Sequence, residues 1–180
     1  MLKKIFFGTA LILTSSIASA DKFMDAKWAL AACDAWNLNE TLMTGLAGDA
    51  WLNNNKDRGY KLIQMYRTDC GEASKVQLNI ADKGGKASCI YGGVPDGKEI
   101  NASVDYVMHA TDARWTELGN NDYGPAKAMM FGRLKFAGPK MEAMSVMSPF
   151  GEFLKLAGSV AGAKGKENCP AATVAEEKAK

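Results

Sequence analysis

The order of local sequence patterns predicts an α+β fold. Apolar residues recur at helical spacing up to residue 51, and they alternate with polar residues in segments between residues 60 and 109. Short helical patterns then surround one more alternating segment at 133–137. Strands that follow one another without long intervening helices form a meander, which argues against a doubly wound parallel sheet.

Residues 1–20 have the features of a secretory signal peptide. Lys3 and Lys4 precede an apolar run at 5–13, and small residues end in Ala-Ser-Ala at 18–20. The run is too short to cross a bilayer core of roughly 30 Å as a permanent helix. We therefore expect cleavage before Asp21, export to the periplasm, and a soluble mature protein.

The mature chain is expected to be nearly neutral. Removing residues 1–20 takes two of the 22 basic residues and none of the 20 acidic ones, which leaves 20 of each. This balance implies neither a nucleic-acid partner nor an anionic membrane. Transient contact with a membrane or an envelope protein stays open, and we expect a monomer in one domain.

The four cysteines all lie in the exported part, where two disulfides can form, although spacing does not give their pairing: Cys33, Cys70, Cys89 and Cys169. No CxxC motif is present, so a redox or zinc role has little support. The segment 30–33 has the form of a bacterial lipid-attachment site. Charged residues separate it from the apolar run, which favours ordinary secretion.

The first half of the mature chain is expected to hold two helices and then strands. The helices are predicted at 22–36 and 40–51, and polar residues at 53–59 end the helical pattern. Strands are predicted at 60–67, 75–81, 86–91 and 102–109. Gly84 and Gly85, which tolerate positive φ, predict a tight hairpin between the second and third of these strands.

The second half is expected to consist of short helices around a strand at 133–137. Thr111 can cap a helix that ends at Gly119, and Pro125 can begin another that runs to 130. A helix from 139 is expected to be broken by Pro149, and an amphipathic helix follows at 150–158. Residues 159–180 are predicted to be a flexible tail, although a disulfide at Cys169 would hold part of it.

The residues from 104 to 138 resemble a known family. They read VDYVM at 104–108, Thr-Asp at 111–112, Leu-Gly at 118–119 and AMMFGRLKFAG at 128–138. This pattern resembles the SCP2 (sterol carrier protein 2) sterol-binding domain family, which shows an Ala-Asp strand, a short helix, a Phe-Met-x-Gly-Lys-Leu-x-x-x-Gly stretch and a closing amphipathic helix. The similarity covers roughly 100–157 well and 60–92 loosely. Met130-Phe131 reverses the usual order, and Arg133 replaces the usual lysine.

The resemblance implies a five-stranded, mostly antiparallel sheet covered on one face by helices, with a hydrophobic tunnel between them. It also implies a non-catalytic carrier of a sterol, a fatty acyl chain or a similar lipid, without a cofactor, in a domain at 21–158. Family members are mostly intracellular, whereas this chain carries an export signal. Its ligand therefore need not be the family's usual one.

The residues themselves also favour a cavity in the second half. Five of the nine methionines of the mature chain fall within nineteen residues, and flexible thioethers adapt to ligands of varied shape. A plain methionine-rich core would have the same composition, and the resemblance favours the cavity. We expect its wall to comprise Met108, Trp115, Leu118, Met129, Met130, Phe131, Leu134, Phe136, Met141, Met144, Met147, Phe150, Phe153 and Leu154.

Other site chemistries receive less support. Met141, Met144 and Met147 could together bind Cu(I), but a buried helix face requires the same spacing. His109 is the only histidine, so we expect a hydrogen-bonded structural role rather than zinc binding or catalysis. No Gly-x-Ser-x-Gly or HExxH motif is present, and we expect no enzymatic activity and no metal. The alternatives are an envelope interaction subunit, or an accessory that presents an apolar substrate to an enzyme.

Overall fold

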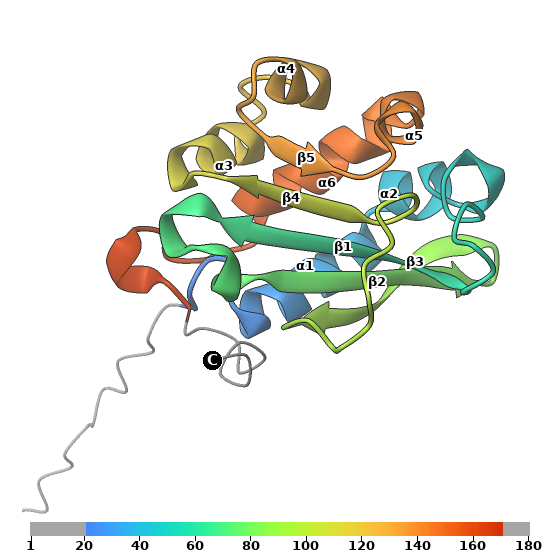
Figure 1. Ribbon diagram of the computed structural model, residues 1–180, viewed down its shortest axis with the longest axis horizontal. Helices are drawn as coiled ribbons and strands as arrows, with labels where there is room; N and C mark the ends of the chain where they lie inside the picture. The colour runs from blue at the N-terminus through green and yellow to red at the C-terminus, as the bar shows by residue number, and fades with distance from the viewer. Residues whose placement is uncertain (1–20, 171–180) are drawn as a thin grey trace, which may run out of the picture.

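The computed structural model describes residues 21–170, and its centre is a five-stranded mixed sheet (Figure 1). The strands lie in the order β3-β2-β1-β4-β5. Their bounds are β1 (Tyr60–Arg67), β2 (Val76–Lys83), β3 (Lys86–Gly93), β4 (Tyr106–Ala110) and β5 (Lys135–Ala137). Only the β1–β4 pair of this sheet is parallel. The predicted α+β fold with a mostly antiparallel sheet is confirmed.

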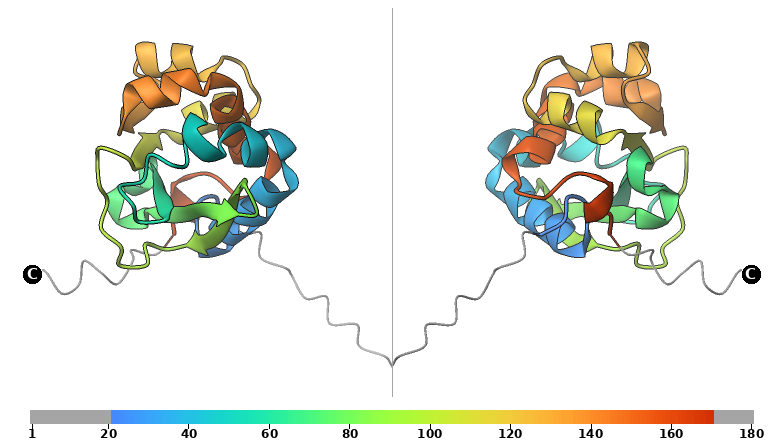
Figure 2. Two further views of the ribbon diagram at one scale, coloured as in Figure 1. Left: turned by 90° about the vertical axis from the view of Figure 1, so that its right-hand side faces the viewer. Right: turned by 90° about the vertical axis from the view of Figure 1, so that its left-hand side faces the viewer.

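The parallel pair arises because residues 94–105 carry the chain from the edge strand β3 across the sheet to β4. This crossing segment lies on the sheet face opposite α1 and α2 (Figure 2). Asp96 fastens the segment by accepting hydrogen bonds from the side chains of Gln77 and Asn79 on β2, at 2.8 and 2.9 Å. Asp105 fastens its end by accepting from the Leu62 backbone N–H at 2.8 Å. The strand predicted from residue 102 therefore begins only at Tyr106.

Helices cover the other face of the sheet, and the main hydrophobic core lies between the two layers. The first helices are α1 (Ala26–Leu38) and α2 (Glu40–Gly45), and α6 (Met147–Ser159) runs alongside them. Asp25 begins α1 by accepting a hydrogen bond from the Trp28 N–H at 2.8 Å. The second predicted helix, 40–51, ends early because Gly48 takes a positive φ of 56° and starts a short 3-10 turn.

Three short helices surround β5: α3 (Asp112–Gly119), α4 (Pro125–Met130) and α5 (Lys140–Ser145). Thr111 caps α3 as predicted, by accepting from the Arg114 N–H at 3.4 Å. Pro149 does not break a helix, which corrects the prediction. It lies in the first turn of α6, where a missing N–H leaves no helical bond unmade, and the break falls at Val146.

Two disulfides join distant segments, as predicted from the four cysteines in the part of the chain that is expected to be exported. Cys33–Cys89 links α1 to β3, and Cys70–Cys169 links the end of β1 to the C-terminal segment. The sulfur of Cys33 is therefore not free to carry a lipid. Next to the first bridge α1 and β3 touch closely, since a Cβ added to Gly92 would lie 2.2 Å from the Ala29 carbonyl oxygen.

The flexible tail predicted from residue 159 is wrong for residues 160–170. Ala163 pairs with Lys22 in an isolated β-bridge, and Arg67 donates to the carbonyl oxygens of Gly165 and Asn168 at 2.8 and 2.9 Å. The fully buried guanidinium of Arg67 needs acceptors, and the C-terminal segment supplies them. Residues 171–180 and the predicted signal peptide at 1–20 lie outside the described residues.

No helix within residues 21–170 is long and apolar enough to cross a membrane.

Candidate ligand-binding site

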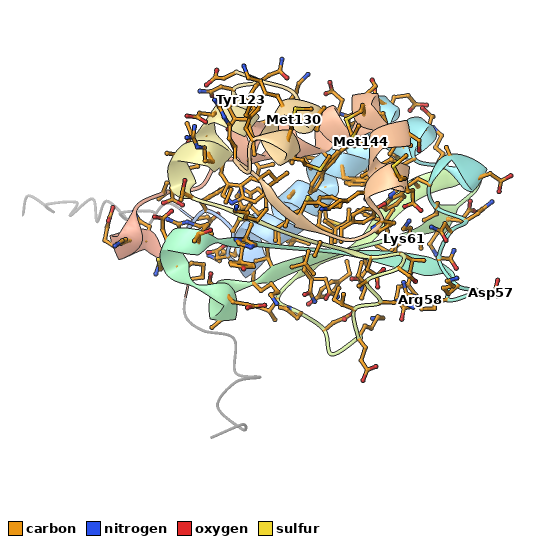
Figure 3. All side chains as sticks on the ribbon, turned by 45° about the horizontal axis from the view of Figure 1, so that its top comes forward. Asp57, Arg58, Lys61, Tyr123, Met130 and Met144 are labelled. Atoms are coloured by element: carbon orange, nitrogen blue, oxygen red, sulfur yellow. A yellow bond between two sulfur atoms is a disulfide. The ribbon has the colours of Figure 1, made fainter. Side chains whose placement is uncertain are left out.

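An open groove of about 410 Å³ lies between α4, β5 and α5, and we call it the methionine groove. Figure 3 shows Met130 on one of its flanking helices and Met144 on the other. Small-molecule sites in proteins have volumes of roughly 300 to 1,000 Å³. The groove is lined by Ala126, Met129, Met130, Gly132, Leu134, Lys135, Phe136, Lys140 and Met144.

The groove exists because β5 is very short and its flanking helices diverge from it. Gly132 ends the turn after α4 with a φ of 64°, a conformation that favours glycine. Gly138 ends the strand with a φ of 138°, and a Cβ there would lie 2.5 Å from the Asp105 carbonyl oxygen. The chain therefore turns sharply on both sides of β5, and Phe136 of this short strand lines the methionine groove.

A second, much smaller space lies beneath the helices. This internal cavity measures about 30 Å³, enough for one or two water molecules and far too little for a lipid chain. Its wall is almost entirely apolar and draws on both halves of the chain: Trp36, Leu46, Trp51, Ile63, Tyr106, Met108, Ala143, Val146, Phe150 and Phe153.

The groove and the cavity share one wall. Phe136 lines the groove and packs edge-to-face against Tyr106 and Phe150, which line the cavity, with ring centroids 5.4 and 5.9 Å apart. On α5, Ala143 lines the cavity and the next residue, Met144, lines the groove. Moving α5 or the Phe136 ring would therefore join the two spaces.

A buried ion pair lies behind one part of the cavity wall, next to Trp51 and Tyr106. Lys61, fully buried on β1, donates to the Trp51 carbonyl oxygen at 3.2 Å and to the carboxylate of Glu142 on α5. Tyr106 donates its hydroxyl proton to the same carboxylate. Burial lowers the pKa of Lys61 below its ordinary value, and the ion pair with Glu142 opposes that shift. Burial and the hydrogen bond to Glu142 both raise the pKa of Tyr106.

Comparison with known proteins places this arrangement in a family. The SCP-2 sterol transfer family profile matches residues 49–151, which include all five strands and most of the groove and cavity wall. The chain belongs to the SCP-2 sterol transfer family. No curated protein sequence matches the chain significantly.

Solved structures agree on the fold. A crystal structure of sterol carrier protein 2 aligns with a TM-score of 0.54 and 20% identity, over 78% of this chain and 100% of the other. A solution structure from Thermus thermophilus, described as a possible sterol carrier protein, aligns with a TM-score of 0.51 and 20% identity, over 82% of this chain and 98% of the other. At these identities the likeness establishes the SCP-2 fold.

The residues predicted to line one tunnel divide between the two spaces and the core. Met129, Met130, Leu134, Phe136 and Met144 line the methionine groove, and Met108, Phe150 and Phe153 line the internal cavity. Trp115, Leu118 and Leu154 are buried in the main core, and Met147 packs against its edge. The tunnel expected from the SCP-2 resemblance is not open in this conformation, because α5 and Phe136 fill the space between groove and cavity.

Three of the predicted wall residues are mostly exposed to solvent. The side chains of Met141, Met130 and Phe131 are 83%, 77% and 66% exposed, and of these only Met130 lines the groove. Met141, Met144 and Met147 were expected to share one buried helix face, but α5 ends at Ser145 and Met147 begins α6. The three thioethers of the Cu(I) alternative therefore do not lie on one helix face.

The sequence argument missed the cavity residues of the N-terminal half. Trp36 comes from α1, Leu46 from the end of α2, and Trp51 from the loop before β1. No SCP-2 motif marks this region. The two tryptophans were the available signal, because large aromatic side chains dominate the energetics of cores and binding sites.

His109 is hydrogen-bonded, as the sequence predicts. Its ring stacks on Tyr66 with centroids 4.5 Å apart, and its Nδ1 lies 3.2 Å from the Thr68 hydroxyl oxygen. Burial lowers the pKa of the imidazole. Within residues 21–170, no cluster of three His, Cys, Asp or Glu side chains is placed to hold a metal ion.

Proposed function

We propose that the chain is a non-catalytic carrier that shields an apolar molecule, such as a sterol, a fatty acyl chain or a similar lipid, from water. The observation that carries the proposal is the wall shared by the methionine groove and the internal cavity. A ligand entering the groove reaches the cavity by displacing only α5 and the ring of Phe136. Membership of the SCP-2 sterol transfer family supports the same function.

The geometry of α5 supports such a movement. The helix has only six residues, follows Pro139 without a side-chain cap, and ends at Ser145. Elements with few buried contacts open at low free-energy cost. Burying ten methylene groups contributes about 8 kcal/mol at roughly 0.8 kcal/mol each, and this gain is set against the cost of ordering the ligand and the protein.

The test is ligand binding by the wild-type protein and by a variant with a blocked groove. Wild type is expected to bind the neutral fluorescent probe N-phenyl-1-naphthylamine and to release it when a long-chain lipid is added. Met144→Trp places a large ring in the groove and should weaken binding by tenfold or more. Leu38→Trp, at an exposed position on α1 (87% exposed), is the matched control and should bind like wild type.

A second candidate, an interaction subunit without a usable cavity, is favoured by the small internal volume and by the exposure of Phe131 and Met141. The same experiment separates the two functions. If native mass spectrometry of protein from its own host shows no bound lipid and wild type does not take up the probe, the carrier proposal is lost. The interaction subunit then becomes the better explanation.

We also propose that the carrier exchanges its ligand at an anionic lipid surface. Residues 123–141, which border the methionine groove, contain four basic residues and no acidic one, although the mature chain is expected to be nearly neutral. Met130, Phe131 and Met141 are exposed on the same segment. Exposed apolar side chains among basic ones are typical of proteins that bind in the interface of anionic membranes.

Reversing two of these charges tests the membrane contact. Lys127→Glu/Lys140→Glu is expected to lower affinity for phosphatidylcholine vesicles containing phosphatidylglycerol by at least tenfold, since each lysine near such a surface contributes about 1 kcal/mol. Vesicle cosedimentation at low and high salt measures the effect. The control variant Lys56→Glu/Lys83→Glu makes the same charge change outside this segment. Equal binding by both variants would rule out this surface.

Export to the periplasm remains a proposal, because residues 1–20 lie outside the described part of the chain. The two disulfides support it, since such bonds persist mainly in oxidising compartments. The mass of the protein recovered from its host checks the proposal, and the expected mature chain begins at Asp21.

A further inference from the structure

The carboxylate of Glu142 is the meeting point of three hydrogen-bond donors from other parts of the chain. Lys61 Nζ and the Tyr106 hydroxyl both donate to its Oε1, and the Asn54 side-chain amide donates to its Oε2. We call this arrangement the Glu142 latch. Because Glu142 is the third residue of the six-residue α5, the latch ties that helix to β1 and β4.

Two donors of the latch have further partners that do not belong to α5. Lys61 lies on β1 with its ammonium group 4.4 Å from the centre of the Trp51 ring and 5.2 Å from that of Tyr106. Trp51 also donates its indole N–H to the Tyr106 hydroxyl oxygen at 2.8 Å. Trp51 therefore holds both the ammonium group of Lys61 and the hydroxyl group of Tyr106 in place. Only the carboxylate of Glu142 comes from α5.

The latch also lies at the edge of the internal cavity. Tyr106 of the latch also belongs to the cavity wall, as does Trp51, which donates to the Tyr106 hydroxyl oxygen, and Ala143 of that wall follows Glu142 directly. The remaining wall is formed by aliphatic, aromatic and thioether side chains. The Lys61 ammonium lies behind this wall, 4.4 Å from the centre of the Trp51 ring. A cation and a hydroxyl next to an apolar space match the chemistry of an amphipathic ligand with an acidic head.

Opening α5 has an electrostatic consequence. If Glu142 leaves with the helix, the buried ammonium of Lys61 loses its counter-charge, and an uncompensated buried charge is strongly destabilising. A ligand with a neutral head leaves that charge unpaired. A ligand that brings its own carboxylate restores the pair with charge-assisted hydrogen bonds, while Glu142 is free to become hydrated.

We propose that Lys61 and Tyr106 form a carboxylate subsite, that the ligand is a long-chain carboxylic acid, and that Glu142 occupies this subsite when the ligand is absent. The acid's head group replaces the Glu142 carboxylate, and its chain extends through the cavity toward the methionine groove. This inference rests on the proposed carrier function and names the ligand class. Glu142 then acts as an internal competitor that keeps the empty protein closed.

The test compares hexadecanoic acid with its methyl ester, which has the same chain without the charge. Both are titrated against N-phenyl-1-naphthylamine bound to the protein. Wild type is expected to bind the acid about tenfold or more tightly than the ester. Lys61→Met removes the cation, keeps a buried side chain of similar length, and should abolish that preference, because the acid loses its counter-charge and the ester no longer leaves a buried ammonium unpaired. Lys86→Met, which removes an exposed lysine paired with Glu40, should keep it.

Glu142→Gln removes the competing charge and leaves Lys61 in place. The acid should bind several-fold more tightly to this variant than to wild type, and the ester should gain less. The double variant Lys61→Met/Glu142→Gln removes both charges, so it reports the loss of preference even if the single lysine variant folds poorly. Circular dichroism and urea unfolding establish that each variant is folded.

The outcomes separate the subsite from the carrier function. Equal binding of acid and ester to wild type, or a preference that survives in Lys61→Met, overturns the carboxylate subsite and leaves the carrier function intact. Binding of neither ligand to wild type overturns the carrier function itself.

Discussion

Replacing Asp112 with alanine is expected to lower the free energy of unfolding by about 3 kcal/mol. Asp112 accepts two hydrogen bonds from the Arg67 guanidinium, at 2.6 and 2.5 Å, and Arg67 is fully buried. Breaking a buried ion pair from one side costs about 3 to 5 kcal/mol, because the remaining charge is uncompensated. We expect the lower end of this range because the Asp112 side chain is 18% exposed. Urea unfolding monitored by tryptophan fluorescence measures the loss.

The pH dependence gives this prediction a second readout. Burial alone would raise the pKa of Asp112, but the hydrogen bonds from Arg67 and the Gly165 N–H outweigh it and hold the pKa below its ordinary value of 3.8. The carboxylate therefore stabilises the fold above that value and loses its contribution as the pH falls through the lower, folded-state pKa. The difference in free energy of unfolding between wild type and Asp112→Ala should therefore become smaller in that acidic range.

An exposed ion pair supplies the control. Asp21 pairs with Lys27 at 3.4 Å, and both side chains are more than half exposed. Asp21→Ala should change stability by less than about 0.5 kcal/mol, as is usual for surface pairs. If Asp21→Ala and Asp112→Ala lowered the free energy of unfolding by similar amounts, burial of Arg67 would not be the reason that its ion pair stabilises the fold.

The elements that local chemistry determines could be predicted from the sequence. Strict alternation at 75–81 places Val76, Leu78 and Ile80 in the core, and the strand forms there. Thr111 and Pro125 begin helices because a capping hydroxyl and a fixed φ act on the residues next to them. The SCP-2 resemblance added the strand count and the helical layer, which no single segment encodes.

Features that depend on distant partners could not be predicted. The spacing of Met141 and Met144 favoured a buried methionine face on α5. Instead, the carboxylate of Glu142 binds Lys61, which lies 81 residues earlier in the chain, and the two methionines are exposed. The composition of the C-terminal segment favoured disorder, but it packs because Arg67 reaches the Asn168 carbonyl oxygen across 101 residues.

The candidate site was predicted in part for the same reason. The methionines and Phe136 of the second half were identified because a family motif and a local cluster mark them. Trp51 and Lys61 were not, since a lysine in a strand usually lies at the surface. Only the fold brings Lys61 beneath α5, where its charge pairs with Glu142 next to the cavity wall.

The disulfide between Cys70 and Cys169 is expected to supply about 4 kcal/mol of stability. The bridge joins residues 99 positions apart, and restricting an unfolded chain with a loop of about 100 residues is worth up to about 4.7 kcal/mol in the chain-entropy model. Cys70→Ser/Cys169→Ser should lower the urea midpoint accordingly, because the unfolded state gains the freedom that the bridge removes.

Local opening should accompany this loss of stability. Without the bridge, the segment 160–170 depends on the Lys22–Ala163 pairing and on its hydrogen bonds to Arg67. Trypsin should then cleave after Lys164 and Lys166 faster than in wild type. Cys33→Ser/Cys89→Ser is the comparison, because it removes a bridge between α1 and β3 and leaves the C-terminal segment tied. Equal cleavage in the two variants under native conditions would mean that the hydrogen bonds of Arg67, and not the bridge, hold the segment in place.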